Sequence, residues 1–284
     1  MAAILNNTGR LIQQIPGITG VNAGGIALVN IPVNARYHRL SFFATHNGAA
    51  STAKLTSLKM LVNGVNMRDI SPANTIAIAR TNGVTPAAGV LPIYFTEPWR
   101  NELAANDSTS WDLAGQATFS VQIGIDATAT NPTLTGEMEF DYLRNVRTSD
   151  DGKSQVPFLQ PVSMHQFQVN GAAGRNDINY LPFDYPITRY WISSGLGNSI
   201  SLIEVYQDGN KIVEGTAAQL NEMYAQYGIL VGGANPFESA SVFDVDGRWW
   251  KALKAANSLN LRVTLSVADT INIVAEYLPG AYQS

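Results

Sequence analysis

Alternating apolar and polar residues mark the clearest strands that this sequence predicts. Between 259 and 267 every second residue is apolar, at Leu259, Leu261, Val263, Leu265 and Val267. Two other segments alternate in the same way, through Phe119, Val121, Ile123 and Ile125 and through Ile271, Ile273, Ala275 and Tyr277. A period of two is typical of a strand with one buried face. Clusters of Gly, Asn, Asp and Pro interrupt the chain every ~8–15 residues, which favours an antiparallel β-sandwich.

Two short helices are predicted at matched places in the two halves of the chain. Ser71 suits a helix cap, Pro72 suits the first helical position, and Asn82-Gly83 supplies a stop. Thr216 and Gln219 have the spacing of a capping box. Apolar residues then follow at helical spacing and end at a glycine: Leu220, Met223, Tyr224, Tyr227 and Gly228.

Four phrases occur in the same order in both halves. Arg36-Tyr37 resembles Arg189-Tyr190, and the predicted hairpin turn Asn63-Gly64 aligns with Asp208-Gly209. "WRNELAAN" at 99–106 resembles "WKALKAAN" at 250–257, and "MEFDYL" at 138–143 resembles "IVAEYL" at 273–278. Their shared order indicates that a whole domain has been duplicated, with a period too long for a solenoid. We expect each Trp phrase to form a second short helix.

The predicted fold class is therefore all-β: two tandem eight-stranded antiparallel jelly-roll sandwiches with short helical insertions, a double jelly roll. A chain of 284 residues is long enough for two such domains. We place the first roll at 21–146 and the second at 166–284. Residues 147–165 are polar and contain Gly and Pro, which is typical of a linker.

The first twenty residues are predicted to form an N-terminal arm or a short amphipathic helix. The helix would end at Pro16-Gly17 and lie on a partner or a lipid surface through its apolar residues, Ile4, Leu5, Leu11, Ile12 and Ile15. A partly ordered arm is the alternative. The segment lacks a signal-peptide pattern, and no stretch of the sequence approaches the ~18 apolar residues of a membrane span.

Composition narrows the classes of function. Charged residues make up only 14% of the chain, against about 25% in a typical soluble domain. A surface of small neutral polar groups is easily desolvated, which suits a protein that packs against copies of itself, although a secreted β-protein fits equally well. The net charge of −4 and the absence of a basic run argue against direct nucleic-acid binding. The chain has no Cys, which excludes disulfides and thiolate metal sites.

Two segments of the second half carry a resemblance to a known family. They are "DGNKIVEGTAAQLNEMYAQYG" at 208–228 and "NLRVTLSVADTINIVAEYLPG" at 260–280. With the duplication and the charge-poor, Cys-free composition, the chain resembles the double jelly-roll major capsid proteins of membrane-containing icosahedral bacteriophages. The coat protein of corticoviruses is the particular likeness. The first half departs further from the family pattern.

The resemblance implies a structural protein without enzymatic activity or a cofactor. It implies homotrimeric capsomers of pseudo-hexagonal outline, because three chains with two rolls each present six similar edges. These capsomers would tile an icosahedral shell over an internal membrane, and residues 1–20 would lie near that membrane. The implied partners are neighbouring capsomers, penton or vertex proteins, minor capsid proteins and the inner viral membrane or its proteins. The implied location is the virion, after assembly in the bacterial host cytoplasm.

Exposed aromatic residues would support a different function, binding of a carbohydrate or a receptor. The candidates are Trp111, Trp191, Trp249 and Trp250. Most aromatic residues of a sandwich fill its core or an interface. Trp249 and Trp250 are adjacent and cannot share a face, so we expect one of them to contact another subunit.

A glycan hydrolase is a further alternative, because hydrolysis needs two carboxylates across a cleft. The candidate pairs are Asp244 with Asp246 and Glu139 with Asp141. Glu139 and Asp141 lie opposite an apolar strand face, so we expect both to be solvated. The three His residues, His38, His46 and His165, have no metal-ligand spacing. A structural Ca²⁺ would suit an Asp-rich loop such as 244–246, but no residue matches a ligand motif.

Overall fold

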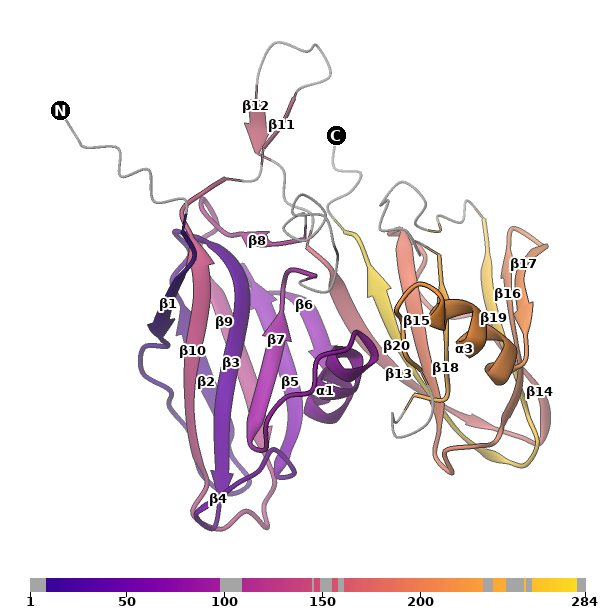
Figure 1. Ribbon diagram of the computed structural model, residues 1–284, viewed down its shortest axis with the longest axis horizontal. Coiled ribbons are helices and arrows are strands. Elements are labelled where there is room, and N and C mark those ends of the chain that lie inside the picture. The colour runs from indigo at the N-terminus through magenta and orange to yellow at the C-terminus, as the bar shows by residue number, and fades with distance from the viewer. Residues whose placement is uncertain are drawn as a thin grey trace. The chain divides into compact units, whose positions relative to one another are not determined.

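A computed structural model describes residues 9–97, 109–144, 146–148, 155–157, 161–231, 237–243, 253 and 257–279. Its residues divide into two compact units, one made of 1–76 with 86–162 and the other of 77–85 with 163–284. In each unit two antiparallel sheets lie face to face (Figure 1). This architecture confirms the prediction of an all-β chain with two tandem sandwiches.

The strands of the first unit form two sheets. In one sheet β1 pairs with β10 and β10 pairs with β3, which also carries β4, β7 and β8; in the other the order is β2-β9-β5-β6. Their bounds are β1 (Leu11–Gln14), β2 (Ile26–Ile31), β3 (Arg36–His46), β4 (Ala49–Ala50), β5 (Leu55–Val62), β6 (Val65–Ile70), β7 (Val90–Tyr94), β8 (Trp111–Asp112), β9 (Phe119–Ile125) and β10 (Thr133–Asp141).

The second unit repeats this plan. One of its sheets has the order β18-β15-β20-β13, and the other has the order β14-β19-β16-β17. The described residues give it eight strands: β13 (Ser163–Gly171), β14 (Gly174–Ile178), β15 (Ile187–Ser194), β16 (Ile200–Gln207), β17 (Asn210–Gly215), β18 (Ser239–Val242), β19 (Leu259–Leu265) and β20 (Asp269–Tyr277).

The region predicted as a linker, 147–165, contains regular structure. A short hairpin joins β11 (Val146–Thr148) to β12 (Gln155–Pro157), and β13 already begins at Ser163.

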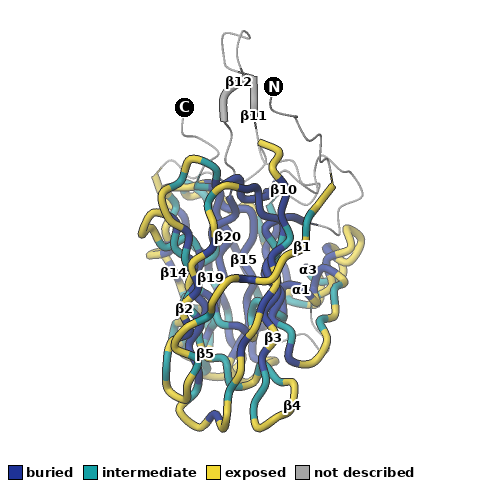
Figure 2. Tube along the Cα trace, turned by 90° about the vertical axis from the view of Figure 1, so that its left-hand side faces the viewer, coloured by how far each residue is buried: buried dark blue, intermediate teal, exposed yellow. Residues whose placement is uncertain are grey.

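Hydrophobic alternation locates the core of each roll. Along β9 and β19 the predicted apolar faces are buried, and the residues between them are largely more exposed. Val267 lies beyond the end of β19 and is 47% exposed. The prediction that Val267 belongs to the buried face is therefore wrong. Figure 2 shows burial concentrated in the strands and exposure in the connecting loops. Every residue of β15 is buried, so this strand has no solvated face.

Both helices predicted from their capping residues are present. The first, α1 (Pro72–Thr81), begins after Ser71, whose Oγ accepts a hydrogen bond from the backbone N–H of Asn74. The second, α3 (Ala217–Ala225), has the complete capping box between Thr216 and Gln219. Gly83 and Gly228 follow the two helices with positive φ, the conformation that a glycine adopts at least cost.

The predicted hairpin turns are also present and equivalent. Asn63 and Asp208 both have φ near +50°, and the glycine that follows each also has positive φ. Two consecutive positive φ angles are the geometry of the tight hairpin turn that Asn-Gly and Asp-Gly favour.

The N-terminal prediction is corrected for the part that the structure describes. Residues 11–14 form the edge strand β1, not a helix, because they pair with β10 in a regular antiparallel ladder. Ile15 is buried against Gly136, where a Cβ atom would lie 2.7 Å from the Ile15 side chain. Ile12 points outward and is 62% exposed, whereas Ile4 and Leu5 lie outside the described residues.

The second predicted helix of each half falls mostly outside the described residues. Residues 99–106 belong to this part, as do most of 250–257. Leu253 is described, and it forms an isolated antiparallel bridge with Ile187. At that residue the helix prediction is wrong, because its backbone N–H and C=O are both used across the bridge.

Candidate functional site

A buried ion pair in the first roll joins the start of β3 to the end of β10. Arg36 at the start of β3 donates from Nε to Asp141 Oδ1 at 3.0 Å and from Nη2 to Oδ2 at 2.6 Å. The two residues are register partners in the β3–β10 ladder. His38 Nε2 lies 2.8 Å from the same Oδ2, and we assign it as the donor because the carboxylate accepts. Two parallel bonds from one guanidinium fix both position and orientation.

The electrostatics of Asp141 follow from these contacts. Burial alone raises the pKa of this carboxyl, but hydrogen bonds from His38 and Arg36 outweigh it and hold the pKa well below its ordinary value. Asp141 is therefore a charged, buried and fully engaged group. The expectation that it is solvated is wrong, because the ladder shifts register between Glu139 and Phe140 and Asp141 becomes buried.

The second roll places the same types of group at the equivalent positions. Arg189 is the third residue of β15 and the register partner of Glu276 on β20, with Nη1 3.5 Å from Oε2. Trp191 donates from its indole Nε1 to Glu276 Oε1 at 2.6 Å. Trp191 stands two residues after Arg189, as His38 stands two residues after Arg36, so each buried carboxylate contacts an Arg and a ring nitrogen. The Arg-Tyr and acid-Tyr-Leu phrases of the sequence thus meet in space in both rolls.

The two hairpin turns are anchored alike as well. Asn63 Oδ1 accepts hydrogen bonds from the backbone N–H groups of Ala117 and Thr118. Asp208 Oδ1 accepts from those of Asn257 and Ser258 at 2.7 and 2.9 Å. Each turn therefore holds the residues that lie just before a long strand, which is β9 in the first roll and β19 in the second.

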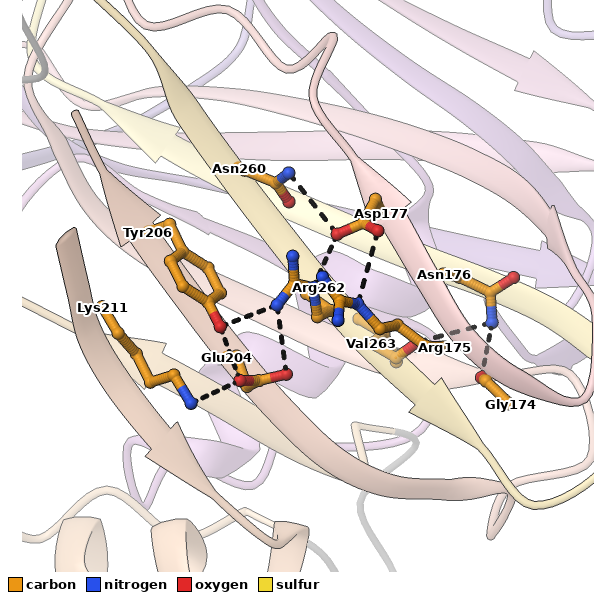
Figure 3. Close-up of polar contacts among 10 residues, drawn as sticks. All are labelled: Gly174, Arg175, Asn176, Asp177, Glu204, Tyr206, Lys211, Asn260, Arg262 and Val263. Atoms are coloured by element: carbon orange, nitrogen blue, oxygen red, sulfur yellow. Dashed lines mark hydrogen bonds and ion pairs between the residues drawn. The ribbon is translucent and has the colours of Figure 1, made fainter. Parts of the chain in front are cut away.

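A network of charged side chains covers the β14-β19-β16-β17 sheet of the second roll (Figure 3). Arg262 donates from Nε to Asp177 at 2.6 Å and from Nη1 to the Tyr206 hydroxyl at 2.7 Å, and its guanidinium carbon lies 4.4 Å from the centre of the Tyr206 ring. Glu204 accepts hydrogen bonds from Tyr206 and from Lys211. Arg262, Glu204 and Tyr206 are thereby held in one conformation.

The titration of this network favours its charged form. The hydrogen bond from Arg262 lowers the pKa of Asp177, and the one from Lys211 lowers the pKa of Glu204. Hydrogen bonds to Glu204 and Glu214 raise the pKa of Lys211. The charged forms of all three groups are therefore favoured near neutral pH.

The aromatic residues proposed for carbohydrate binding are only partly described. Trp111 and Trp191 are both completely buried, so neither forms a sugar platform. They fill their rolls instead: Trp111 packs on Phe95 with ring centres 4.6 Å apart, and Trp191 packs on Phe237 at 5.8 Å. Trp249 and Trp250 lie outside the described residues.

The candidate catalytic and metal residues do not assemble into a site in the described part of the chain. Glu139 pairs with Arg10 and Arg39, while Asp141 is taken by Arg36 and His38. His46 accepts a hydrogen bond from Thr130 N–H, and His165 lies 2.9 Å from Ser163 Oγ. Asp244 and Asp246 lie outside the described residues, and among the described ones no group of three potential ligands could hold a metal ion. None of the described helices is long and apolar enough to cross a membrane.

Sequence reasoning missed the two buried carboxylates, although a signal was present. A charged residue precedes Tyr-Leu in both copies of that phrase, and an Arg precedes Tyr in both copies of the other. Charges retained at equivalent places of two copies point to a shared contact. The network around Arg262 has no such signal, because the alignment that pairs Asn63 with Asp208 places Lys59 against Glu204 and Leu61 against Tyr206.

Comparison with known proteins extends these observations. Residues 12–141 match the family model "Viral coat protein P2 N-terminal domain", and residues 162–280 match "Viral coat protein P2 C-terminal domain". No curated protein matches the chain.

Several solved capsid proteins share the fold. The major capsid protein P2 from Bacteriophage PM2 aligns with a TM-score of 0.79 and 18% identity, over 95% of this chain and 97% of its own. The structure of Sulfolobus Turreted Icosahedral Virus aligns with a TM-score of 0.63 and 12% identity, over 96% and 92%. The PBCV-1 virus capsid aligns with a TM-score of 0.63 and 10% identity, over 97% of both chains. At such identities the likeness shows the fold.

Proposed function

The chain belongs to the viral coat protein P2 family and has a coat protein's role in the capsid of a virion, and from this premise we propose how it assembles. Its unit of assembly is a homotrimer of pseudo-hexagonal outline, and such trimers tile an icosahedral shell over an internal membrane. The carrying observation is the equivalence of the two rolls, down to the Arg–carboxylate pair and the anchored turn. Three chains with two equivalent rolls each would present six similar edges to their neighbours.

The proposed partners follow from this arrangement. They are neighbouring capsomers, penton or vertex and minor capsid proteins, and the inner membrane or its proteins, with assembly in the cytoplasm of a bacterial host. Trp249 and Trp250 are proposed subunit contacts. Residues 1–20 are proposed to lie near the membrane; within them β1 belongs to the sheet of the first roll, and its exposed Ile12 supports an apolar contact there.

The proposed role is structural and not enzymatic. One of the two carboxylate pairs considered for hydrolysis supports this, because Glu139 and Asp141 both form ion pairs with arginine. The structure does not support carbohydrate binding through Trp111 and Trp191, because both side chains are buried.

Light scattering after size-exclusion chromatography tests the trimer. We expect the full chain to have about three times the monomer mass of 30.6 kDa. Trp250→Ala should lower that mass with an unchanged circular dichroism spectrum, while the surface variant Lys59→Ala should leave it unchanged. A folded wild-type monomer at every concentration would overturn the proposal.

Cosedimentation with anionic phospholipid vesicles tests the arm. The full chain should bind, and Ile4→Ser with Leu5→Ser should reduce the bound fraction severalfold. Equal binding by the wild type and this variant would show that the arm does not contact lipid.

A further inference from the structure

One loop differs in length between equivalent strands of the two rolls. In the first roll residues 32–35 connect β2 to β3, whereas in the second residues 179–186 connect β14 to β15, which is twice the length. The longer loop has the sequence "NYLPFDYP" and carries three aromatic residues, of which Tyr180 and Tyr185 are about half exposed. The shorter loop, "PVNA", has none. Closing a roll does not need the additional residues, because the first roll closes without them.

The aromatic loop borders a hollow on the second roll. The hollow has a volume of about 570 Å³, inside the range of about 300–1,000 Å³ that small-molecule sites occupy. All of its lining residues belong to this roll: Asn179, Phe183, Tyr206, Gly209, Asn257, Ser258, Leu259, Asn260 and Arg262. Two aromatic rings, three side-chain amides, two hydroxyls and a guanidinium therefore line one hollow.

Several walls of the hollow are rigid. Arg262 and Tyr206 are fixed by the network of Figure 3, and the backbone of Asn257 and Ser258 is held by Asp208. A site whose polar groups are already fixed loses little conformational entropy when a ligand binds.

One polar atom of the lining lacks a partner. Asn260 donates from Nδ2 to Asp177 at 3.5 Å, but its Oδ1 is buried and accepts no hydrogen bond in the described structure. A buried acceptor without a donor costs about 1–3 kcal/mol. The Oδ1 atom itself is buried but the residue is only half-buried, so rotation of the Asn260 side chain would bring Oδ1 to a hydroxyl or N–H donor of a ligand and remove this cost.

The charges around the hollow select the class of ligand. Arg262 is neutralised by Asp177 and Glu204, so it presents no free positive charge to an anion. The described lining contains no carboxylate that could bind a cation, so a ligand without net charge fits these walls better than an ion. A neutral polyhydroxylated molecule can donate to Asn260, accept from the other amides and place its C–H faces on Phe183. We propose that this hollow binds a neutral saccharide.

Ligand-observed saturation-transfer NMR on the full chain tests this site. The probes are glucose, galactose, mannose and N-acetylglucosamine, with sialic acid as an anionic comparison. We expect signal from at least one neutral sugar and none from sialic acid. Asn260→Ala and Phe183→Ala should each weaken binding tenfold or more. Asn179→Ala, at an exposed position of the lining, gives a further variant should either of those fail to fold.

The matched control lies in the short loop of the first roll. Val33→Ala should leave sugar binding unchanged, because that loop borders no such lining. Absence of binding by all four neutral sugars, or equal binding by wild type, Asn260→Ala and Asn179→Ala, would overturn the inference. It stands independently of the capsomer proposal, because oligomer mass by light scattering reports on that proposal without any sugar.

Discussion

The two rolls share a buried polar contact and differ in the exposure of the residues next to it. Both hold a buried carboxylate between an Arg and a ring nitrogen, yet the ring is His38 in the first roll and Trp191 in the second. The Tyr-Leu that follows the carboxylate differs more. Tyr142 and Leu143 are 54% and 43% exposed, whereas Tyr277 and Leu278 are buried. Duplicated positions that keep the internal contact and change exposure indicate that the two rolls meet different surroundings.

The ion pairs offer the sharpest test of this comparison. Arg36→Ala leaves Asp141 buried without its bidentate partner, so we expect a loss of about 3–5 kcal/mol in the free energy of unfolding. Arg189→Ala should cost less, because Arg189 reaches Glu276 at only 3.5 Å and Trp191 still donates. Urea unfolding followed by fluorescence measures the free energy of unfolding of both variants.

A double variant controls for this effect. Arg36→Leu combined with Asp141→Leu leaves no buried charge and should recover much of the loss. Equal losses from Arg36→Ala and Arg189→Ala would mean that the bidentate geometry does not distinguish the two pairs.

Acid should destabilise the first roll through Asp141. Its pKa is depressed in the folded state, so its contribution to stability is complete above the unfolded pKa of about 3.9 and is lost as pH falls toward the folded pKa. Asp141→Asn should be less stable at pH 7, and its urea midpoint should fall less than that of the wild type below about pH 4. If the urea midpoints of the wild type and Asp141→Asn fell equally with decreasing pH, Asp141 would not be the source of the acid sensitivity.

The helix caps should show a smaller difference. Thr216→Ala removes the hydroxyl that accepts from the Gln219 N–H, which is the side-chain half of the capping box, and should cost about 1 kcal/mol. Ser71→Ala removes a single cap next to Pro72, which already has the helical φ, so its cost should be lower. Thermal unfolding of the two variants measures which one loses more stability. A larger loss from Ser71→Ala than from Thr216→Ala would contradict the prediction.

Local chemistry made much of the fold predictable. Asn63-Gly64, Asp208-Gly209, Ser71 and Thr216 each determine a turn or a helix start through contacts with nearby backbone, and the structure confirms all four. Such features need no knowledge of distant residues.

The errors came from contacts between distant residues. β1 became a strand because β10, more than a hundred residues away, offers an edge for it. Asp141 is buried because a register shift in β10 brings it among Arg36 and His38. The hollow near Asn260 depends on a loop whose position no periodicity encodes. Candidate sites assembled from several strands are therefore less predictable than the strands themselves.

The pairing of first and last strands has a consequence for the order of folding during synthesis. Leu11 pairs with Phe140 in the first roll, and Ser163 pairs with Tyr277 in the second. Contacts this distant in sequence form slowly, because a long loop must close before they are gained. On the ribosome, the first roll cannot complete these sheets until β10 has emerged, and the second cannot complete them until β20 has emerged. Each roll thus passes through a stage with open strand edges, and the first leaves that stage before the second.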